Sequence, residues 1–221
     1  MGAIARNVRA LLREVPSGVT VVAAAKTRAP EEVLEAVEAG IGAVGENYVQ
    51  EAERAIEAVG RRSRWHLIGH LQRNKAARAV ALFDLVETVD SLALGEALDR
   101  ACERLGRILP VLVEVNSGRE PRKSGVVPER AEGLVRALAG LPHLEVRGLM
   151  TLGPESSDPE DLRPAFRETR RLLGEVRTLA IPRVRMEVLS MGMTDSWRVA
   201  VEEGSTMIRI GTGIFGGRPR A

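Results

Sequence analysis

Short apolar segments alternate with longer segments of helical periodicity along the whole chain, and this alternation constrains the fold more than any other feature. Segments rich in strand-favouring residues lie at 20–25, 41–44, 64–68, 83–88, 109–116, 144–150, 185–189 and 206–210. Segments of helical periodicity lie at 3–15, 30–39, 47–59, 73–81, 91–105, 128–139, 159–176 and 194–202. A strand followed by a helix, repeated in this way, predicts a parallel sheet with right-handed crossovers.

Eight such units in 221 residues predict an α/β protein folded as a compact (β/α)8 TIM barrel. We expect residues 1–221 to form a single domain, because no long Pro-, Gly- or Ser-rich linker divides them. The segment at 3–15 is expected to be an extra N-terminal helix on the bottom or side of the barrel. An open, doubly wound sheet is the alternative fold.

Charge and cysteine content narrow the classes of partner. The formal net charge is only +2, so no strong basic field indicates a nucleic acid. Cys102 is the only cysteine, so an intrachain disulfide is not expected, and no segment approaches the roughly 20 apolar residues of a membrane span. We therefore expect a cytoplasmic protein that binds neither nucleic acid nor a membrane.

The functional side chains of a TIM barrel lie where its strands end at their carboxyl side. Polar or glycine-rich segments follow the expected strands at 26–27, 45–48, 69–72, 116–118, 150–151, 190–193 and 211–213. The first of them contains Lys26, one of only three lysines in a chain with 29 arginines. A desolvated lysine amine can lose its proton and attack a carbonyl, which a guanidinium cannot do. The alternative is a side chain that simply extends to solvent.

The end of the last expected strand is rich in glycine. A turn of this kind that opens a short helix can bind a phosphate through its backbone N–H groups. Gly211 and Thr212, together with Ser190 at the end of the preceding strand, are the expected donors. A tight turn without a ligand is the alternative.

Arg209 alternates with Met207 along the last expected strand, so both side chains should lie on one face. Because an isolated buried charge is costly, Arg209 should be paired or contact a ligand. Asp195 and Glu46 are the expected structural partners, and a heterocyclic nitrogen or a phosphate is the alternative. No metal site is expected, because no third ligand accompanies the two histidines at 66 and 70. Asn47 is expected near the cap of a helix.

Seven ordered motifs resemble the pyridoxal phosphate homeostasis protein family, also known as the proline-synthase co-transcribed proteins. They are AKT at 25–27, GENYVQE at 45–51, WHLIGHLQRNK at 65–75, KSG at 123–125, RGLMT at 147–151, LSMGMTD at 189–195 and GSTMIRIGTGIFG at 204–216. The resemblance implies a barrel of fold type III, similar to the N-terminal domain of alanine racemase, that binds pyridoxal 5'-phosphate (PLP).

The resemblance also implies roles for individual residues. Lys26 would form the Schiff base, and Arg209 would face the pyridine nitrogen. Ser190, Gly211 and Thr212 would bind the cofactor phosphate, and Asn47 would line the pocket. Family members often carry a second lysine two positions after the first, where this chain has Arg28.

The implied function is intracellular PLP homeostasis and supply, without established turnover and with no catalytic residue assigned. Apo forms of PLP-dependent enzymes are the implied recipients, and we expect a monomer. A PLP-dependent racemase-like or lyase-like enzyme is the alternative, and a cofactor-free Schiff-base aldolase ranks third. An arginine at the pyridine nitrogen weakens the ring as an electron sink. A racemase also needs a second acid/base, whereas the only tyrosine, Tyr48, lies within the expected barrel.

Overall fold

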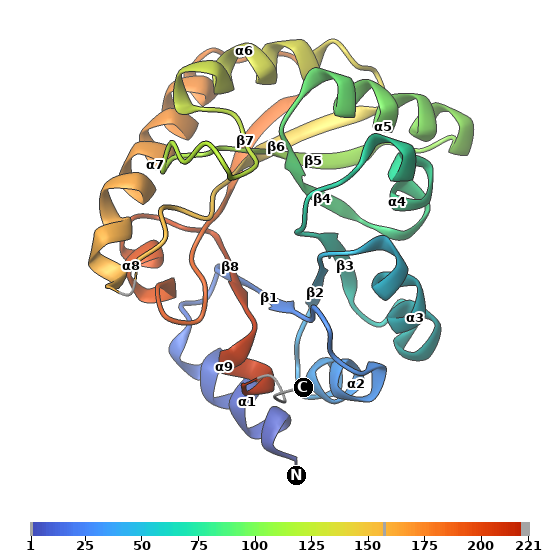
Figure 1. Cartoon of the computed structure of the whole chain (residues 1–221), viewed down its shortest axis with the longest axis vertical. Coiled ribbons are helices and arrows are strands. Elements are labelled where there is room, and N and C mark those ends of the chain that lie inside the picture. Colours follow the sequence, from blue (N-terminus) through green and yellow to red (C-terminus); the bar gives the residue numbers. More distant parts are fainter. Residues whose placement is uncertain (1, 157, 218–221) are drawn as a thin grey trace.

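The computed structural model describes residues 2–156 and 158–217, and in this part of the chain eight parallel strands close into a barrel (Figure 1). The strands pair in sequence order, and β8 pairs with β1. They are β1 (Thr20–Ala24), β2 (Ala43–Glu46), β3 (Arg64–Leu67), β4 (Leu85–Val89), β5 (Leu109–Glu114), β6 (Leu144–Met150), β7 (Val184–Ser190) and β8 (Met207–Ile210). The predicted (β/α)8 barrel is therefore confirmed, and the open sheet is wrong.

The helices form a ring around the strands (Figure 1). They are α1 (Ala3–Glu14), α2 (Pro30–Glu38), α3 (Val49–Val59), α4 (Ala76–Leu82), α5 (Leu92–Leu105), α6 (Pro128–Ala139), α7 (Arg163–Thr178), α8 (Trp197–Glu202) and α9 (Thr212–Phe215). Short 3-10 turns, η1 (Arg73–Lys75) and η2 (Pro159–Leu162), precede α4 and α7. The extra helix α1 packs on the side of the barrel against α2 and α9. No helix of the described residues is long and apolar enough to cross a membrane.

Local sequence signals explain where the helices begin and end. In α5, the Ser91 hydroxyl caps the first turn by accepting a hydrogen bond from the Leu94 amide over 3.4 Å. Gly106 ends the same helix with a φ of 61°, which glycine adopts without a side-chain clash. Proline opens both α2 and α6, where its fixed φ suits the first turn.

Besides α4 and α7, whose predicted first turns are the 3-10 turns η1 and η2, two helices begin later than the sequence predicts. The residue that caps α3 is Tyr48 rather than Asn47, because the chain is still extended at this point. The helix α8 begins at Trp197 instead of Thr194, because Ser196, with φ −117° and ψ 0°, is not helical. The Thr194 hydroxyl accepts a hydrogen bond from Gly213 in the next loop. These differences leave Asn47 and Thr194 in the loops that follow β2 and β7.

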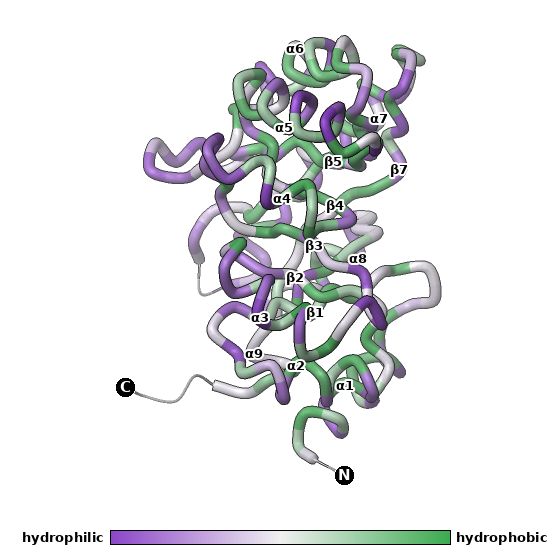
Figure 2. The backbone as a smooth tube through the Cα atoms, turned by 90° about the vertical axis from the view of Figure 1, so that its right-hand side faces the viewer, coloured by the Kyte–Doolittle hydropathy of each residue, from purple (hydrophilic) through white to green (hydrophobic). Residues whose placement is uncertain are grey.

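Apolar side chains fill both sides of the barrel wall. The larger cluster lies between the strands and the helices, and a smaller one lies inside the barrel. Figure 2 shows apolar stretches along the strands and alternating apolar and polar stretches along the helices. Each buried Val, Leu, Ile or Met side chain stabilises the fold by roughly 1.5–3 kcal/mol. The smaller cluster comprises Val22, Ala43, Leu85, Leu112, Met150 and Met207.

Candidate functional site

Lys26 lies just past the end of β1, in a loop at the carboxyl rim of the barrel. Ala24 pairs with Gly45 on β2, so Lys26 and Asn47 each lie two residues beyond a paired position on neighbouring strands. The half-buried Lys26 amine lies 5.4 Å from the centre of the Tyr48 ring. Within residues 2–156 and 158–217, no carboxylate or hydrogen-bond acceptor binds this amine. Among the described residues, the close partner of the Lys26 amine is thus the aromatic face of Tyr48.

The glycine-rich turn after β8 lies beside the end of β1. A Cβ atom on Gly211 would lie 3.4 Å from the Ala24 carbonyl oxygen, so the two chains approach closely. The amide of Gly213 donates a hydrogen bond to the Thr194 hydroxyl over 3.2 Å. This bond joins the loop after β7 to α9, as expected for two neighbouring loops of one rim. Gly211 and the exposed Thr212 therefore lie one strand away from the strand that leads to Lys26.

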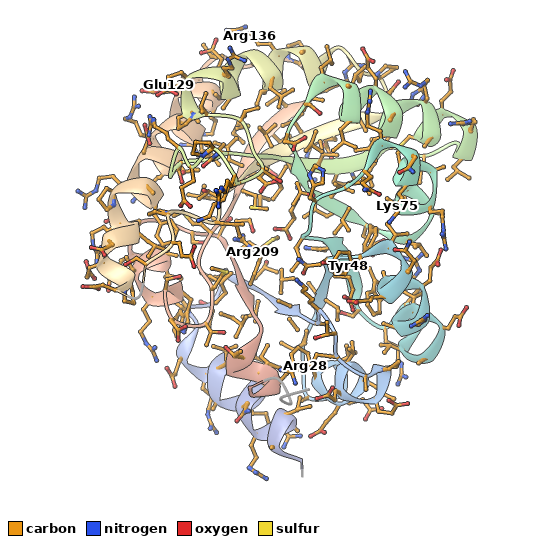
Figure 3. The ribbon with its side chains drawn as sticks, in the orientation of Figure 1. Arg28, Tyr48, Lys75, Glu129, Arg136 and Arg209 are labelled. Atoms are coloured by element: carbon orange, nitrogen blue, oxygen red, sulfur yellow. The ribbon has the colours of Figure 1, made fainter. Side chains whose placement is uncertain are left out.

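Arg209 points from β8 into the interior of the barrel (Figure 3). Its side chain is only 3% exposed. Nη1 donates a hydrogen bond to the Ser190 hydroxyl over 2.6 Å, and Nη2 donates to the Thr151 carbonyl oxygen over 2.8 Å. Its counter-charge is Glu87 on β4, whose Oε2 lies 4.0 Å from Nη1. Burial lowers the pKa of Arg209, whereas the Glu87 and Glu114 charges raise it, and a guanidinium stays protonated in proteins.

Ser190 belongs to this interior cluster and is fully buried. Its hydroxyl donates to Glu87 Oε2 over 2.6 Å while accepting from Arg209. Glu87 Oε1 in turn lies 2.8 Å from His66 Nδ1. Burial alone would raise the pKa of Glu87, but His66, Arg209 and Ser190 together bring it below its ordinary value. The structure thus brings Ser190 together with Arg209.

The two structural partners expected for Arg209 are wrong. Asp195 is exposed in the loop before α8. Glu46 lies on the helix-facing side of β2, together with Val44, and is 1% exposed. Its Oε2 has no hydrogen-bond partner, and burial followed by the Glu51 charge raises the pKa of Glu46 to about 8. Glu46 is therefore separated from Arg209 by the barrel wall.

Glu87 and Glu114 are site residues that the sequence analysis missed. Glu114 ends β5 and is 4% exposed, with an Oε2 that has no hydrogen-bond partner. Burial and the Asp90 charge raise the pKa of Glu114 to about 7, against the effect of Arg209. Each glutamate interrupts an apolar run at a strand position, and that interruption is the signal that could have identified them.

Other residues singled out in the sequence have structural partners. Lys123 Nζ binds Glu120 Oε1 over 2.7 Å and the Gly153 carbonyl oxygen over 3.2 Å. Arg28 donates hydrogen bonds to the carbonyl oxygens of Phe215 and Gly216 at the end of α9. Among the described residues there is no group of three or more side chains suited to holding a metal ion.

These features suit a small molecule that carries both a carbonyl group and a phosphate. The carboxyl rim presents an amine without a carboxylate partner beside a glycine-rich turn. The interior beneath it holds a buried cation whose further N–H groups can meet a neutral acceptor.

Comparison with known proteins points to the same family as the sequence motifs do. The family model described as "Alanine racemase, N-terminal domain" matches residues 1–219. A pyridoxal phosphate homeostasis protein from Pasteurella multocida is 37% identical over 205 residues, which cover 91% of this chain and 88% of the relative.

Solved structures agree with the fold. PipY from Synechococcus elongatus, solved with PLP bound, is 35% identical with a TM-score of 0.89, over 96% of this chain and all of PipY. An alanine racemase from Clostridium difficile shares the fold at 13% identity and a TM-score of 0.79, over 98% of this chain and 56% of the racemase. From its motifs, its barrel and these relatives, the chain belongs to the pyridoxal phosphate homeostasis protein family.

Proposed function

We propose that this protein binds PLP as a Schiff base on Lys26 and acts in the cytoplasm as a carrier in PLP homeostasis. The observation that supports the proposal most strongly is the pairing of chemistry on the adjacent strands β1 and β8. Strand β1 leads to the Lys26 amine, which has no carboxylate partner among the described residues, and β8 carries the buried guanidinium of Arg209. When bound, PLP would supply an aldehyde to the Lys26 amine and a pyridine ring to the Arg209 guanidinium.

The donor set of Arg209 fits a pyridine nitrogen. A guanidinium carries five N–H groups, and Ser190 and Thr151 accept from two of them. A remaining N–H can therefore donate to the unprotonated ring nitrogen. Glu87 holds the charge of Arg209 in place, so the guanidinium is positioned before any ligand arrives.

We propose that Gly211, Thr212 and Ser190 bind the phosphate and that Asn47 lines the pocket. The backbone at Gly211 and Thr212 opens α9 and can offer N–H groups to an anion. Ser190 would contribute by donating its hydroxyl proton to the phosphate in place of Glu87, while still accepting from Arg209.

The residues around the Lys26 amine favour a protein that carries PLP over an enzyme that turns over a substrate rapidly. An arginine at the ring nitrogen leaves that nitrogen unprotonated and so limits the electron demand of the ring. The only tyrosine of the chain lies beside Lys26 and is 47% exposed, instead of lying across a closed pocket as a second acid/base. We therefore rank a racemase-like or lyase-like activity second. We also propose that the protein acts as a monomer and passes PLP to apo forms of PLP-dependent enzymes.

The small number of lysines makes the Schiff base directly testable. Lys26, Lys75 and Lys123 are the only lysines, so borohydride reduction with PLP followed by peptide mass spectrometry has three lysine targets. We expect a visible absorption band, reduced stoichiometrically onto Lys26. Lys26→Ala should abolish the band, whereas the control variants Lys75→Ala and Lys123→Ala should keep it. A wild-type protein that stays colourless with excess PLP would refute the proposal.

A second experiment separates a carrier from an enzyme. Protein loaded with PLP is incubated with a panel of L-amino acids in deuterated water, and α-proton exchange is followed by NMR. In parallel, it is mixed with an apo form of a PLP-dependent enzyme, and the recovered activity is measured. A carrier reactivates the apo-enzyme without catalysing exchange. Exchange that turns over and requires Lys26 would instead establish the enzyme.

A further inference from the structure

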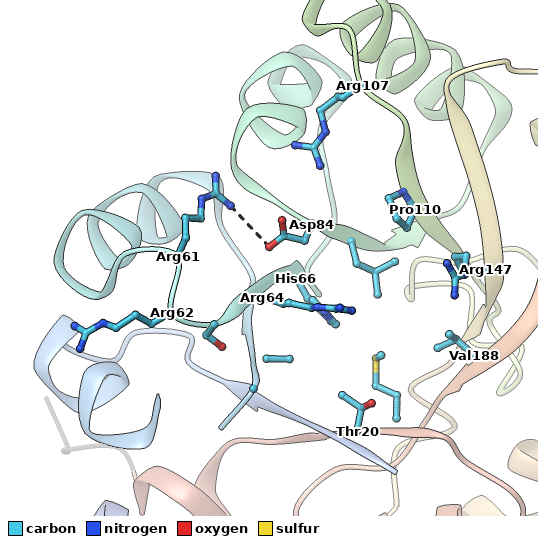
Figure 4. Close-up of a pocket in the computed structure, with 15 residues that line it drawn as sticks. Thr20, Arg61, Arg62, Arg64, His66, Asp84, Arg107, Pro110, Arg147 and Val188 are labelled. Atoms are coloured by element: carbon cyan, nitrogen blue, oxygen red, sulfur yellow. Dashed lines mark ion pairs between the residues drawn. The ribbon is translucent and has the colours of Figure 1, made fainter. Parts of the chain in front are cut away.

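A large cavity opens at the amino end of the barrel, opposite the rim that carries Lys26. Its volume is about 840 Å³. The residues that form it come from the strands and from the segments that precede them, and Figure 4 shows them around the opening. We call it the amino-end cavity, and its arginines are Arg61, Arg62, Arg64, Arg107 and Arg147.

Carboxylates neutralise only some of these arginines. Arg62 pairs with Glu38 over 3.4 Å. Arg61 lies 3.8 Å from Asp84, as the dashed line in Figure 4 marks. In the amino-end cavity, these two arginines therefore add little net positive charge.

Arg147 is likewise neutralised. It contacts Glu145 over 3.2 Å and Glu187 over 3.0 Å. Glu145 also binds Arg185 over 2.9 Å, so two arginines and two glutamates balance one another on this side of the opening.

Two arginines of the amino-end cavity keep an uncompensated charge. Arg107 donates only to the carbonyl oxygens of Val80 and Phe83, over 2.6 and 3.2 Å, and these acceptors carry no formal charge. Arg64 has no hydrogen bond or ion pair to any described residue, although it stands at the start of β3 and lines the cavity. Because guanidinium groups match phosphate and carboxylate oxygens in pairs, these two positions favour an anion.

Buried polar atoms without hydrogen-bond partners in the residues that line the amino-end cavity also indicate a ligand, and this argument does not depend on charge. Ser63 lines the amino-end cavity, and its buried hydroxyl has no hydrogen-bond partner among the described residues. Ser63 itself is only 7% exposed. Arg147 Nε is also buried without a partner. A buried polar group without a partner costs about 1–3 kcal/mol, and a ligand with acceptor oxygens would recover part of that cost.

We propose that the amino-end cavity is a second binding site, which takes a small molecule carrying two or more phosphoryl or carboxylate groups. Arg64 and Arg107 supply the charge, and Ser63 supplies a neutral donor. The site lies at the opposite end of the barrel from Lys26, so it can be filled while PLP occupies the carboxyl rim. Its existence does not depend on the function proposed above.

The test is isothermal titration calorimetry of the full chain, saturated with PLP, with pyrophosphate in one arm and citrate in the other. We expect saturable binding with one site per chain, weakened by salt. Arg64→Gln should weaken binding about tenfold, because one charge-assisted contact is lost. This variant should fold normally, since Arg64 contacts no other described residue through hydrogen bonds or ion pairs. Binding of only one anion identifies the group that the site prefers and still supports the proposal.

The control is Arg130→Gln, an exposed position on α6 that removes the same charge outside the cavity. It should leave the affinity unchanged. Three results would overturn the proposal: no saturable binding of either anion, equal binding by wild type and Arg64→Gln, or equal losses in Arg64→Gln and Arg130→Gln. A repeat with Lys26→Ala shows whether the anion instead occupies the carboxyl rim.

Discussion

At the residue scale, the buried glutamates of the barrel wall differ in what they contact. Glu87 has a hydrogen bond to His66, another to Ser190 and a nearby cation, so its negative charge is well compensated. Glu46 and Glu114 each have a side-chain oxygen without a partner. Burial therefore favours the neutral form of Glu46 and Glu114, whereas the partners of Glu87 outweigh its burial and favour its charged form.

Glu46 should make the stability of the protein depend on pH. Its pKa is raised to about 8 in the folded state, from an ordinary value of 4.5. The folded chain therefore keeps a proton that the unfolded chain releases, so the free energy of unfolding should fall as pH rises from about 5 to about 8. Glu46→Gln should make this decrease in the free energy of unfolding smaller by roughly 2–4 kcal/mol. The measurement is urea unfolding at a series of pH values from about 5 to about 8.

The control for this prediction is Glu57→Gln, at an exposed position on α3, which should keep the wild-type dependence. Glu114, with a pKa of about 7, acts in the same direction, so some dependence should remain in Glu46→Gln. An unchanged dependence in Glu46→Gln would contradict the assignment.

Residues at strand ends were predictable from the sequence, whereas their interior partners were not. Lys26 and Gly211 were placed at one rim because the ends of parallel strands must meet there. The partner of Arg209 was missed because Glu87 lies on β4, and the two strands face each other only after the barrel closes. Propensity and spacing along the chain carry no information about such a contact.

At the element scale, α9 is too short to be stable alone, and its neighbours hold it in place. Asn7 on α1 donates a hydrogen bond to the Ile214 carbonyl oxygen over 3.0 Å. Arg28 binds the last carbonyl oxygens of α9 and lies 5.4 Å from the Phe215 ring. The residue that replaces the frequent second lysine of the family thus connects the Lys26 loop to the proposed phosphate site.

Arg28→Ala should therefore weaken both the fold and PLP binding. Hydrogen bonds to a charged group contribute about 1.5–3 kcal/mol, so we expect a loss of stability of that size in urea unfolding. We also expect several-fold weaker PLP binding, measured by titrating the absorption band. Arg28→Lys should be intermediate, because an ammonium cannot span both carbonyl oxygens as a planar guanidinium does.

The matched control is Arg130→Ala, which removes from α6 an exposed arginine that has no hydrogen bond or ion pair to any described residue. It should change neither quantity. Wild-type PLP affinity in Arg28→Ala would show that α9 is held adequately by its other neighbours.

The sequence predicted which strands and helices exist, but it did not predict where some of the helices start. All eight predicted strands are confirmed, with ends shifted by no more than a few residues. The helix α8 starts late because Ser196 departs from helical backbone angles, and α3 starts late because Tyr48 is extended. Both shifts arise from tertiary contacts or backbone conformation that helical periodicity does not report.

At the scale of the whole molecule, PLP bound as proposed at the carboxyl rim would contact residues that follow or end β1, β2, β7 and β8, and should stabilise the closed barrel. At a PLP concentration about 100 times the dissociation constant, mass action contributes about 2.7 kcal/mol. For a chain of this size, Tm should rise by roughly 5–10 °C in a thermal scan. Lys26→Ala should show a much smaller rise, whereas Lys75→Ala should match wild type. An equal rise in all three would indicate that PLP stabilises the fold from another position.

The ion pair of Lys123 has a further consequence for a protein that handles an aldehyde. Free aldehydes form adducts with accessible amines on any protein surface, and a carrier meets such a reagent throughout its life. This chain has replaced almost every surface amine by a guanidinium, and it engages Lys123 with Glu120 and a carbonyl oxygen. Under the proposed function this composition would favour chemoselectivity, because Lys26 lies at the carboxyl rim and Lys75 is the only other lysine without an ion pair among the described residues.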